Sequence, residues 1–281
     1  MPPRTKKGVM KKIILLFAAL SILVLYPFTD GSAASAEKPA AKKKAAPKPA
    51  AHTVFDLSHA EIFSPVANGE LDYTSFHDMI KAAGVTTAVN TETITPKRLS
   101  GVKTYVIAGP AMGFTEQEGA ALRNFVKNGG NLLVLTHIAP PVAPITSMFG
   151  ILISNFVVAE QNNTIEGRSQ DFLVTKFSGH PVTSGLEKIA VYGTWGLMAE
   201  PGKETKNAAV VAATSEKAWA DLNRNRVLNE DEPVQEFGII AVSGLGKGKV
   251  VVVADDAPFA NKFLGQADNR KLAENIIGWL K

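Results

Sequence analysis

The stretch TYVIAGPAMGFTEQEGAALRNFVKNGGNLLVL, residues Thr104–Leu135, contains two apolar runs separated by an amphipathic segment. The first run, Thr104–Ala108, and the second, Leu132–Leu135, have the length and composition of buried strands. Between them, Thr115 and Glu118 have the spacing of a capping box at the start of a helix, and an Asn-Gly-Gly segment ends that helix. This alternation of strand, helix and strand with short joints predicts a parallel sheet covered by helices on both faces.

The same pattern continues towards the N-terminus. Thr53–Leu57 and Val85–Val89 are expected strands, and between them Asp72 is expected to cap a helix that stops at Gly84. The sequence therefore extends the parallel sheet by two strands on this side.

Towards the C-terminus the pattern changes. Short β-like runs between Ile151 and Ala213 predict an antiparallel extension of the same sheet. Gly238–Val242 and Val250–Ala254, joined by the turn GLGKG, predict a hairpin, and a helix over Asn269–Leu280 closes the fold. The turn lacks the GK[ST] ending of a phosphate-binding loop, so no nucleotide site is expected there.

The first 51 residues have a different composition. Residues 1–36 have the layout of a secretory signal peptide: two lysines, the apolar run Ile13–Phe28, and small residues at Ala34-Ser35-Ala36. Residues 37–51 form a basic Lys/Ala/Pro linker without an apolar face, and residues 52–281 form the α/β domain. The expected location is periplasmic or secreted; without cleavage, residues 13–28 would anchor the chain in the inner membrane and be its sole contact with a membrane.

The basic residues are concentrated before the domain. Ten of the 30 lysines and arginines, but two of the 26 acidic residues, lie in residues 1–51, so the remainder has 20 basic and 24 acidic residues and a net charge of −4. A slightly acidic domain is not attracted to phosphate backbones, and no nucleic-acid partner is expected. The chain has no cysteine, which excludes a thiolate nucleophile, a zinc–thiolate site and disulfides.

Several segments resemble an uncharacterised bacterial family of the class I glutamine amidotransferase-like superfamily, near the GIFT-type and trehalose-utilisation-type domains. They are DLSHAEIFSP, Tyr73-Thr-Ser-Phe76, ITPKRL, NGGNLLVL, HPVTSGL, VVVVADDAPFAN and LAENIIGWL. The resemblance implies a flavodoxin-like, mostly parallel sheet. It also implies a nucleophilic cysteine on the turn after the strand that follows the Gly-Gly pair, but this chain has Thr136-His137 there, so amidotransferase activity does not carry over. For GIFT-type domains the resemblance implies protein partners.

Polar residues follow the expected parallel strands, at the edge where open α/β sheets bind ligands. They are Asp56, Ser58, His59, Glu61, Thr136, His137, Asp255, Asp256 and Asn261, and Gly109 follows the strand Thr104–Ala108 at the same edge. His59, His137 and Asp256 are the candidates for proton transfer or for binding a divalent ion. The alternative is structural: the histidines and carboxylates cap strand ends, turns and the following helix.

A second candidate site is the segment Asp221–Glu232. Its spacing matches a calcium loop, with side-chain ligands at Asp221, Asn223, Asn225, Asn229 and Glu232 and a carbonyl ligand at Val227. Arg226 occupies the sixth position, where glycine is preferred, and the flanks do not have the pattern of paired helices. A plain polar hairpin loop is the alternative. The sequence establishes no cofactor, and calcium is the candidate that this loop offers.

These observations leave two classes of function open. The first is a non-catalytic domain of the cell envelope that binds a small molecule or an envelope protein, with calcium as a stabilising ion. The second is a hydrolase or isomerase that acts on a small carbohydrate-like substrate through His59, His137 and Asp256.

Overall fold

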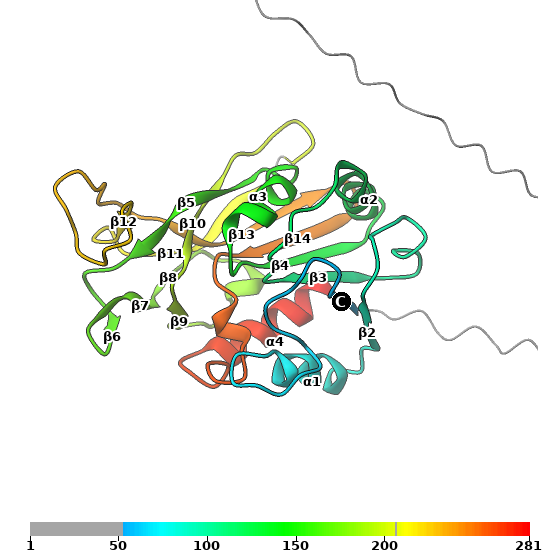
Figure 1. The fold of residues 1–281 in the computed structure, drawn as a ribbon, viewed down its shortest axis with the longest axis horizontal. Coiled ribbons are helices and arrows are strands. Elements are labelled where there is room, and N and C mark those ends of the chain that lie inside the picture. Colours follow the sequence, from blue (N-terminus) through cyan, green and yellow to red (C-terminus); the bar gives the residue numbers. More distant parts are fainter. Residues whose placement is uncertain (1–52, 206) are drawn as a thin grey trace, which may run out of the picture. The chain divides into compact units, whose positions relative to one another are not determined.

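The computed structural model describes residues 53–205 and 207–281 (Figure 1). The expected signal segment, anchor and linker, residues 1–36, 13–28 and 37–51, lie outside the described residues. Four α-helices are present in the described part: α1 (Thr74–Ala82), α2 (Glu116–Lys127), α3 (Ala139–Ser147) and α4 (Asn269–Leu280). Among these helices, none is long and apolar enough to cross a membrane.

Most of the described strands belong to one 11-stranded sheet, and β6, β7 and β9 form a second. The strands are β1 (Thr53–Asp56), β2 (Thr87–Asn90), β3 (Thr104–Ala108), β4 (Asn131–Leu135), β5 (Ile151–Ala159), β6 (Thr164–Ile165), β7 (Arg168–Val174), β8 (Lys176–Phe177), β9 (Ile189–Tyr192), β10 (Trp195–Ala199), β11 (Ala209–Ala213), β12 (Trp219–Asp221), β13 (Gly238–Leu245) and β14 (Gly248–Val253). Short 3-10 turns cover Pro181–Thr183 and Ala257–Phe259.

The large sheet has a parallel part and an antiparallel part. Nine of its strands follow the order β12-β5-β10-β13-β14-β4-β3-β1-β2, and outside this order β11 pairs antiparallel with β13 and with β8. The strands from β14 to β2 run parallel, whereas β13, β10, β5 and β12 pair antiparallel. This confirms a mixed α/β fold with a parallel sheet, an antiparallel extension and a β13–β14 hairpin.

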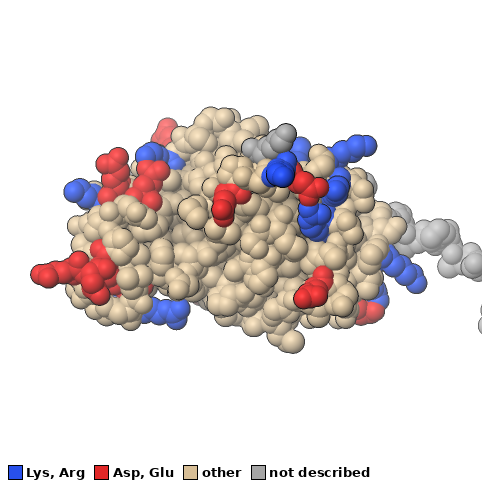
Figure 2. Space-filling view, turned by 90° about the horizontal axis from the view of Figure 1, so that it is seen from above, with Lys and Arg blue, Asp and Glu red and all other residues tan. Residues whose placement is uncertain are grey.

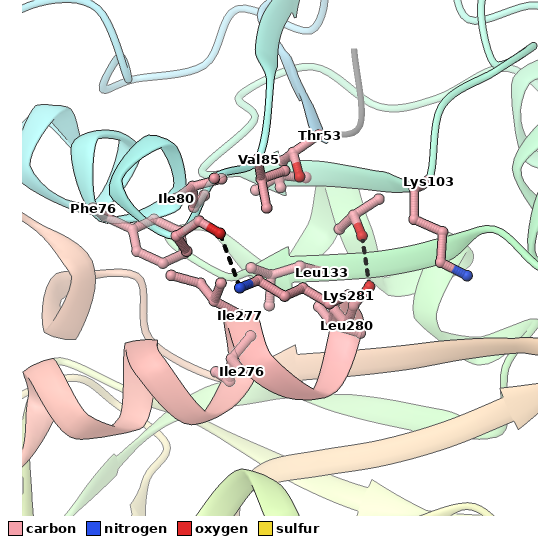
Figure 3. Close-up of a pocket in the computed structure, with 14 residues that line it drawn as sticks. Thr53, Phe76, Ile80, Val85, Lys103, Leu133, Ile276, Ile277, Leu280 and Lys281 are labelled. Carbon is pink, nitrogen blue, oxygen red and sulfur yellow. Dashed lines mark hydrogen bonds between the residues drawn. The ribbon is translucent and has the colours of Figure 1, made fainter. Parts of the chain in front are cut away.

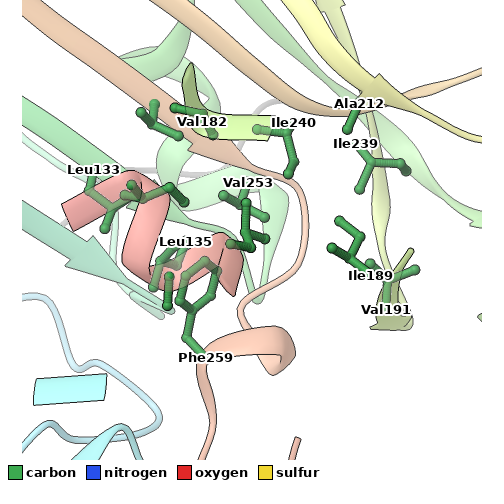
Figure 4. Packing of buried hydrophobic residues seen from close by; sticks show 14 of the residues in the cluster. Leu133, Leu135, Val182, Ile189, Val191, Ala212, Ile239, Ile240, Val253 and Phe259 are labelled. Carbon is green, nitrogen blue, oxygen red and sulfur yellow. The ribbon is translucent and has the colours of Figure 1, made fainter. Parts of the chain in front are cut away.

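Helices cover both faces of the parallel strands. α1 and α4 lie on one face and α2 and α3 on the other (Figure 1). Neighbouring residues of one strand serve opposite faces: Leu133 and Leu135 join the core under α1 and α4, whereas Leu132 and Val134 join the core under α2 and α3. Figure 4 shows the first of these cores, where Phe259 packs beside Leu135 and Val253.

The structure corrects three local expectations. The N-cap of α1 is Tyr73, without a side-chain cap, because the carboxylate of Asp72 accepts the amides of Ser64 and Gly69 instead. The helix α3 was not expected, since its sequence contains three prolines. The middle of the chain builds the separate sheet β6-β7-β9 as well as the antiparallel extension.

Candidate functional site

The parallel strands β1, β3, β4 and β14 end at one edge of the sheet, and the candidate residues follow them there. The first cluster consists of His137, after β4, and Asp256, after β14. His137 Nδ1 lies 3.1 Å from Asp256 Oδ1, and the hydroxyl of Tyr73 donates to Asp256 Oδ2 at 2.5 Å. Asp256 and Tyr73 are buried, whereas the His137 side chain is 38% exposed. A buried carboxylate thus orients a histidine that solvent can reach.

The surroundings of His137 fix its position. The Phe63 ring packs edge-on against the imidazole with centroids 5.2 Å apart, and Trp195 Nε1 donates to the His137 carbonyl at 3.1 Å. The hydrogen bond to the Asp256 carboxylate raises the pKa of His137, with burial opposing the shift. An oriented imidazole with a raised pKa is suited to hold a proton, or to donate one to a ligand at neutral pH.

Gly109, after β3, allows this cluster to form. Its φ is 63°, in the left-handed region, and a Cβ at this position would lie 3.1 Å from Asp256 Oδ2 and 3.2 Å from His137 Cβ. Glycine meets both demands, because it has no Cβ and adopts this backbone conformation at low cost.

The second cluster surrounds His59, after β1. His59 Nδ1 lies 2.6 Å from Asp56 Oδ2, and Nε2 lies 3.3 Å from Glu118 Oε1 on α2. Asp56 Oδ1 also accepts hydrogen bonds from Tyr105 at 2.9 Å and Ser58 at 2.7 Å. Burial would raise the pKa of Asp56, but the bonds from His59 and Ser58 outweigh it and lower that pKa.

The neighbouring carboxylates favour the protonated form of His59. Burial disfavours its charge, but Asp56 and Glu118 together raise its pKa. The ring stacks on Phe114 with centroids 3.9 Å apart and is almost inaccessible to solvent. Because both ring nitrogens face carboxylates, the imidazolium neutralises this cluster.

Glu61 joins the second cluster from the same loop. Its Oε2 accepts the His59 amide at 3.0 Å, and its buried Oε1 has no hydrogen-bond partner among the described residues. Burial and the neighbouring Asp56 charge raise the pKa of Glu61 to about 7. Asp56, His59 and Glu61 each offer a ligand atom within 4.8 Å of the others. A metal ion bound by these three residues would compete with a proton for the His59 ring nitrogen that faces Asp56.

Asp255 and Asn261 form hydrogen bonds to loop backbone, and Thr136 is buried. The carboxylate of Asp255 accepts the amides of Tyr192 at 2.5 Å and Ala257 at 2.9 Å, and burial together with the Asp256 charge raises its pKa to about 8. Asn261 accepts the Ser75 amide and donates to the Gly69 carbonyl. Thr136 Oγ1 is buried without a hydrogen-bond partner among the described residues, so no base activates it.

The structure thus brings His137 and Asp256 together but assigns His59 to a different set of partners. Two residues that the sequence did not single out as site residues complete the clusters. Tyr73 was noted only within a motif, and Glu118 only as a capping residue. The Glu118 carboxylate serves two purposes, because it completes the Thr115 capping box and faces His59.

The segment Asp221–Glu232 follows β12 and is organised by hydrogen bonds to its own backbone. Asp221 Oδ1 accepts the Asn225 amide and Oδ2 the Arg226 amide, while Glu232 accepts the amides of Leu222 and Asn229. The Val227 carbonyl accepts the side-chain amide of Asn229 at 2.7 Å. Asp221 and Glu232 are buried, although every other residue of the segment is more exposed.

Arg224 and Arg226 adopt left-handed backbone conformations, with φ of 61° and 63°. The sixth position of the segment therefore makes the sharp turn without glycine. The Arg224 guanidinium lies 5.9 Å from the centroid of the Trp195 ring, the same ring that holds the His137 carbonyl. The loop thus reaches the neighbourhood of the first cluster.

Charged side chains are mixed on the face that Figure 2 shows. Lysines and arginines lie beside acidic residues at both ends of this face, and a broad area between them has few charges. No continuous basic surface crosses this face.

The fold and these clusters define a class: α/β proteins with a parallel sheet, helices on both faces and an antiparallel extension. Residues 70–277 match the family described as "Domain of unknown function (DUF4350)". Because this match covers most of the chain, the protein belongs to the DUF4350 family. A search of curated proteins finds no significant match.

Solved structures share the fold. The mmIFT52 N-terminal domain is 18% identical, with 81% of this chain and 96% of that chain covered and a TM-score of 0.65. The cytoplasmic protein STM1381 from Salmonella typhimurium LT2 is 12% identical, with 82% and 99% covered and a TM-score of 0.53. At these identities the similarity extends to the fold and not to function.

Proposed function

We propose that this DUF4350 protein is a non-catalytic binding domain of the cell envelope, built on an amidotransferase-like sheet of the flavodoxin-like type. Its ligand, a small polar molecule or an envelope protein, contacts the loops after the parallel strands. The observation that carries the proposal is the hydrogen bonding of the carboxylates on these loops. Asp56, Asp255 and Asp256 all accept hydrogen bonds from groups of the same domain. Such carboxylates stabilise loops and are not free to act on a substrate.

Two further features support a binding role. The chain has no cysteine, and the hydroxyl that replaces it, Thr136 Oγ1, is buried without an adjacent base among the described residues. In addition, exposed apolar side chains lie on the same loops: Ile62, Val66, Leu71 and Met112 are 40–60% exposed. Exposed apolar side chains of this kind are typical of surfaces that bind partners.

The test is the substitution His137→Ala in the full-length protein. Chromogenic esters and glycosides and a panel of sugars and divalent ions would be screened for turnover and for thermal shifts. We expect no turnover that depends on His137, and any ligand shift retained in the variant. Turnover by the unaltered protein that His137→Ala abolishes would overturn the proposal.

The second candidate is a hydrolase or isomerase acting on a small carbohydrate-like substrate. The observation that favours it is the partly exposed His137 oriented by buried Asp256, which is the arrangement of a general acid or base. His137 and Asp256 would act as a pair, and His59 would hold the neighbouring loop. Asp256→Asn would then reduce turnover as strongly as His137→Ala, because the imidazole would lose its orienting partner.

Calcium binding by Asp221–Glu232 is compatible with either function. Support comes from the left-handed Arg226, which gives the turn that this type of loop requires, and from the buried carboxylates of Asp221 and Glu232 at its two ends. Calcium would replace the Asn229 amide at the Val227 carbonyl. Its proposed role is to fix the loop near Trp195.

A further inference from the structure

The second cluster, around His59, has the donor atoms of a metal site. Asp56, His59 and Glu61 each offer a ligand atom, and these atoms lie within 4.8 Å of one another. The nitrogen and oxygen ligands of a zinc ion lie about 2.0 to 2.2 Å from the metal, so two of them are at most about 4.4 Å apart. Small movements of the three side chains would therefore bring all of them to one ion.

In each carboxylate of this set, one oxygen is held by a hydrogen bond and the other is turned to the cluster or has no partner. Asp56 Oδ1 accepts the hydroxyl of Tyr105 at 2.9 Å, and Oδ2 faces His59. Glu61 Oε2 accepts the His59 amide at 3.0 Å, whereas the buried Oε1 has no hydrogen-bond partner among the described residues. A buried carboxylate oxygen without a partner is rare in folded proteins, and an ion bound to it is one explanation.

The imidazole of His59 is arranged in the same way. Its Nδ1 faces Asp56 Oδ2 at 2.6 Å, and its Nε2 lies 3.3 Å from Glu118 Oε1 on the other side of the ring. The ring also stacks on Phe114, which fixes its plane. Histidines that bind metals almost always donate their second ring N–H to a carboxylate or a carbonyl group. Glu118 therefore has the place of a positioning residue behind a metal ligand.

His59 is the cationic partner of these carboxylates in the described part of the chain. Asp56, Glu61 and Glu118 form no ion pair with a lysine or arginine there. A proton on His59 Nδ1 contacts Asp56, whereas a divalent ion at the same place would contact all three side chains. Buried carboxylates are costly without a compensating charge, and a divalent ion supplies two positive charges.

The other end of β1 offers no such donors. Thr53, the first residue of the strand, borders a cavity of about 270 Å³ between α1 and α4 (Figure 3). None of the 14 residues that line this cavity is acidic or a histidine. Asp56, the last residue of β1, belongs to the cluster. Of the two ends of β1, the carboxyl end is thus the one with the chemistry to bind a metal ion.

We propose that Asp56 Oδ2, His59 Nδ1 and Glu61 Oε1 bind one Zn²⁺ ion. Zinc accepts imidazole nitrogen and carboxylate oxygen together, and three protein ligands are enough to hold it. Ser58 Oγ, 3.1 Å from His59 Nδ1, offers a fourth oxygen. The ion fixes the loop that leads to Phe63, whose ring packs against His137. This site is independent of the choice between a binding domain and an enzyme.

The test is calorimetric titration of the full-length protein with Zn²⁺, after bound metals have been removed with a chelator. We expect one ion per chain and a dissociation constant below about 10 µM. X-ray absorption of the zinc-loaded protein should show one imidazole nitrogen, with oxygens as the other ligands, at about 2.0 to 2.2 Å. Weaker binding, no binding, or a spectrum with two or more imidazoles would overturn the proposal.

Two substitutions within the cluster locate the ion. Glu61→Gln keeps an oxygen for the His59 amide but loses the carboxylate. It should weaken zinc binding by more than about 100-fold, because losing a ligand costs more than losing an outer partner. Glu118→Gln should weaken it by about 10- to 100-fold, since the imidazole loses the carboxylate behind it. Thermal unfolding without zinc checks that both variants fold.

Two further substitutions are controls. The exposed Glu116→Gln makes the same change in the first turn of α2 and should leave the zinc affinity unchanged. Asp256→Asn alters the cluster around His137 and should leave it unchanged as well. Zinc binding that persists in Glu61→Gln, or that is lost in Asp256→Asn, would place the ion elsewhere and refute the proposal.

Discussion

The hydroxyl of Tyr73 donates a hydrogen bond to Asp256 across 183 residues of sequence, at 2.5 Å. This bond ties the start of α1 to the end of β14, and both residues are buried. Burial and the Asp256 charge raise the pKa of Tyr73 well above its usual value, so the donor stays protonated at physiological pH.

Tyr73→Phe removes this donor and leaves the buried Oδ2 of Asp256 without this hydrogen bond. We expect the free energy of unfolding to fall by about 2 kcal/mol, the usual scale for a hydrogen bond to a charged group. Urea unfolding followed by circular dichroism measures this change. Tyr192→Phe is the control, because that hydroxyl makes no hydrogen bond among the described residues. Equal losses in the two variants would contradict a specific role for the Tyr73 bond.

Gly109 and Gly84 provide a matched pair for the crowding around Asp256. Both have a left-handed φ, 63° and 78°, so alanine costs about 1 kcal/mol of backbone strain at either position. Only at Gly109 would the new Cβ crowd Asp256 and His137. Gly109→Ala should therefore be more destabilising than Gly84→Ala by about 1 to 2 kcal/mol. Urea unfolding gives the difference in free energy of unfolding between the two variants. A difference near zero would mean that Asp256 and His137 move aside for the new Cβ without cost.

Glu118 provides a second matched pair, this time with Glu116 in the first turn of the same helix. Glu118 is buried and accepts the amides of Thr115 and Ile94 as well as facing His59, whereas Glu116 is exposed. Glu118→Ala should lower the free energy of unfolding by about 3 kcal/mol, because it leaves buried donors and an imidazolium without their acceptor. Glu116→Ala should change it by less than about 0.5 kcal/mol. Urea unfolding would contradict this argument if the two losses were similar.

Local signals predicted the elements but not the clusters. The segment Thr104–Leu135 was predicted correctly because its apolar runs, capping box and glycine stop all act within a few residues. Asp72 was assigned wrongly as a helix cap because its carboxylate is taken by amides of the preceding loop. A capping residue is ambiguous in sequence whenever a folded loop also has free amides nearby.

The candidate site depended on contacts between distant residues. The rule that ligands bind at the strand ends placed His137 and Asp256 on one edge, and the structure joins them. The same rule could not show that His59 would face Glu118 on α2, 59 positions later in the sequence. Sequence position indicates the edge of the sheet, whereas the partner of each side chain depends on packing.

Stability should decrease as the pH rises from about 5 to 8.5. Asp255, with a pKa of about 8, and Glu61, with a pKa of about 7, bind a proton more tightly in the folded protein than in the unfolded chain. The unfolded chain therefore loses these protons first, and stability falls as the pH rises towards each folded pKa. The raised pKa values of His59 and His137 act in the same direction, because their stabilisation is present below about pH 6.5 and is lost as the pH rises through the folded pKa.

Below about pH 4.5 the direction reverses. The pKa values of Asp56 and Glu118 are lowered in the folded protein, so their stabilisation is lost as the pH falls. Urea unfolding between pH 3 and 9 should thus show maximal stability near pH 5. Glu61→Gln and Asp255→Asn should each flatten the decline above that maximum, and the exposed Glu216→Gln should not. A protein more stable at pH 8.5 than at pH 5.5 would refute the assignment.

Calcium should stabilise the protein if the segment Asp221–Glu232 binds it. An ion bound only by the folded state stabilises by about 2.7 kcal/mol at a concentration one hundred times its dissociation constant, which thermal unfolding in calcium and in chelator detects. Asp221→Ala should remove this response. It also removes acceptors for the Asn225 and Arg226 amides, which lowers stability without calcium, so the calcium response is compared and not the baseline.

Asp231→Ala removes the same charge from an exposed position of the same loop that is not a predicted ligand, and it should keep the response. A response retained in Asp221→Ala, or absent from the unaltered protein, would leave this segment as a hairpin loop stabilised by its own hydrogen bonds.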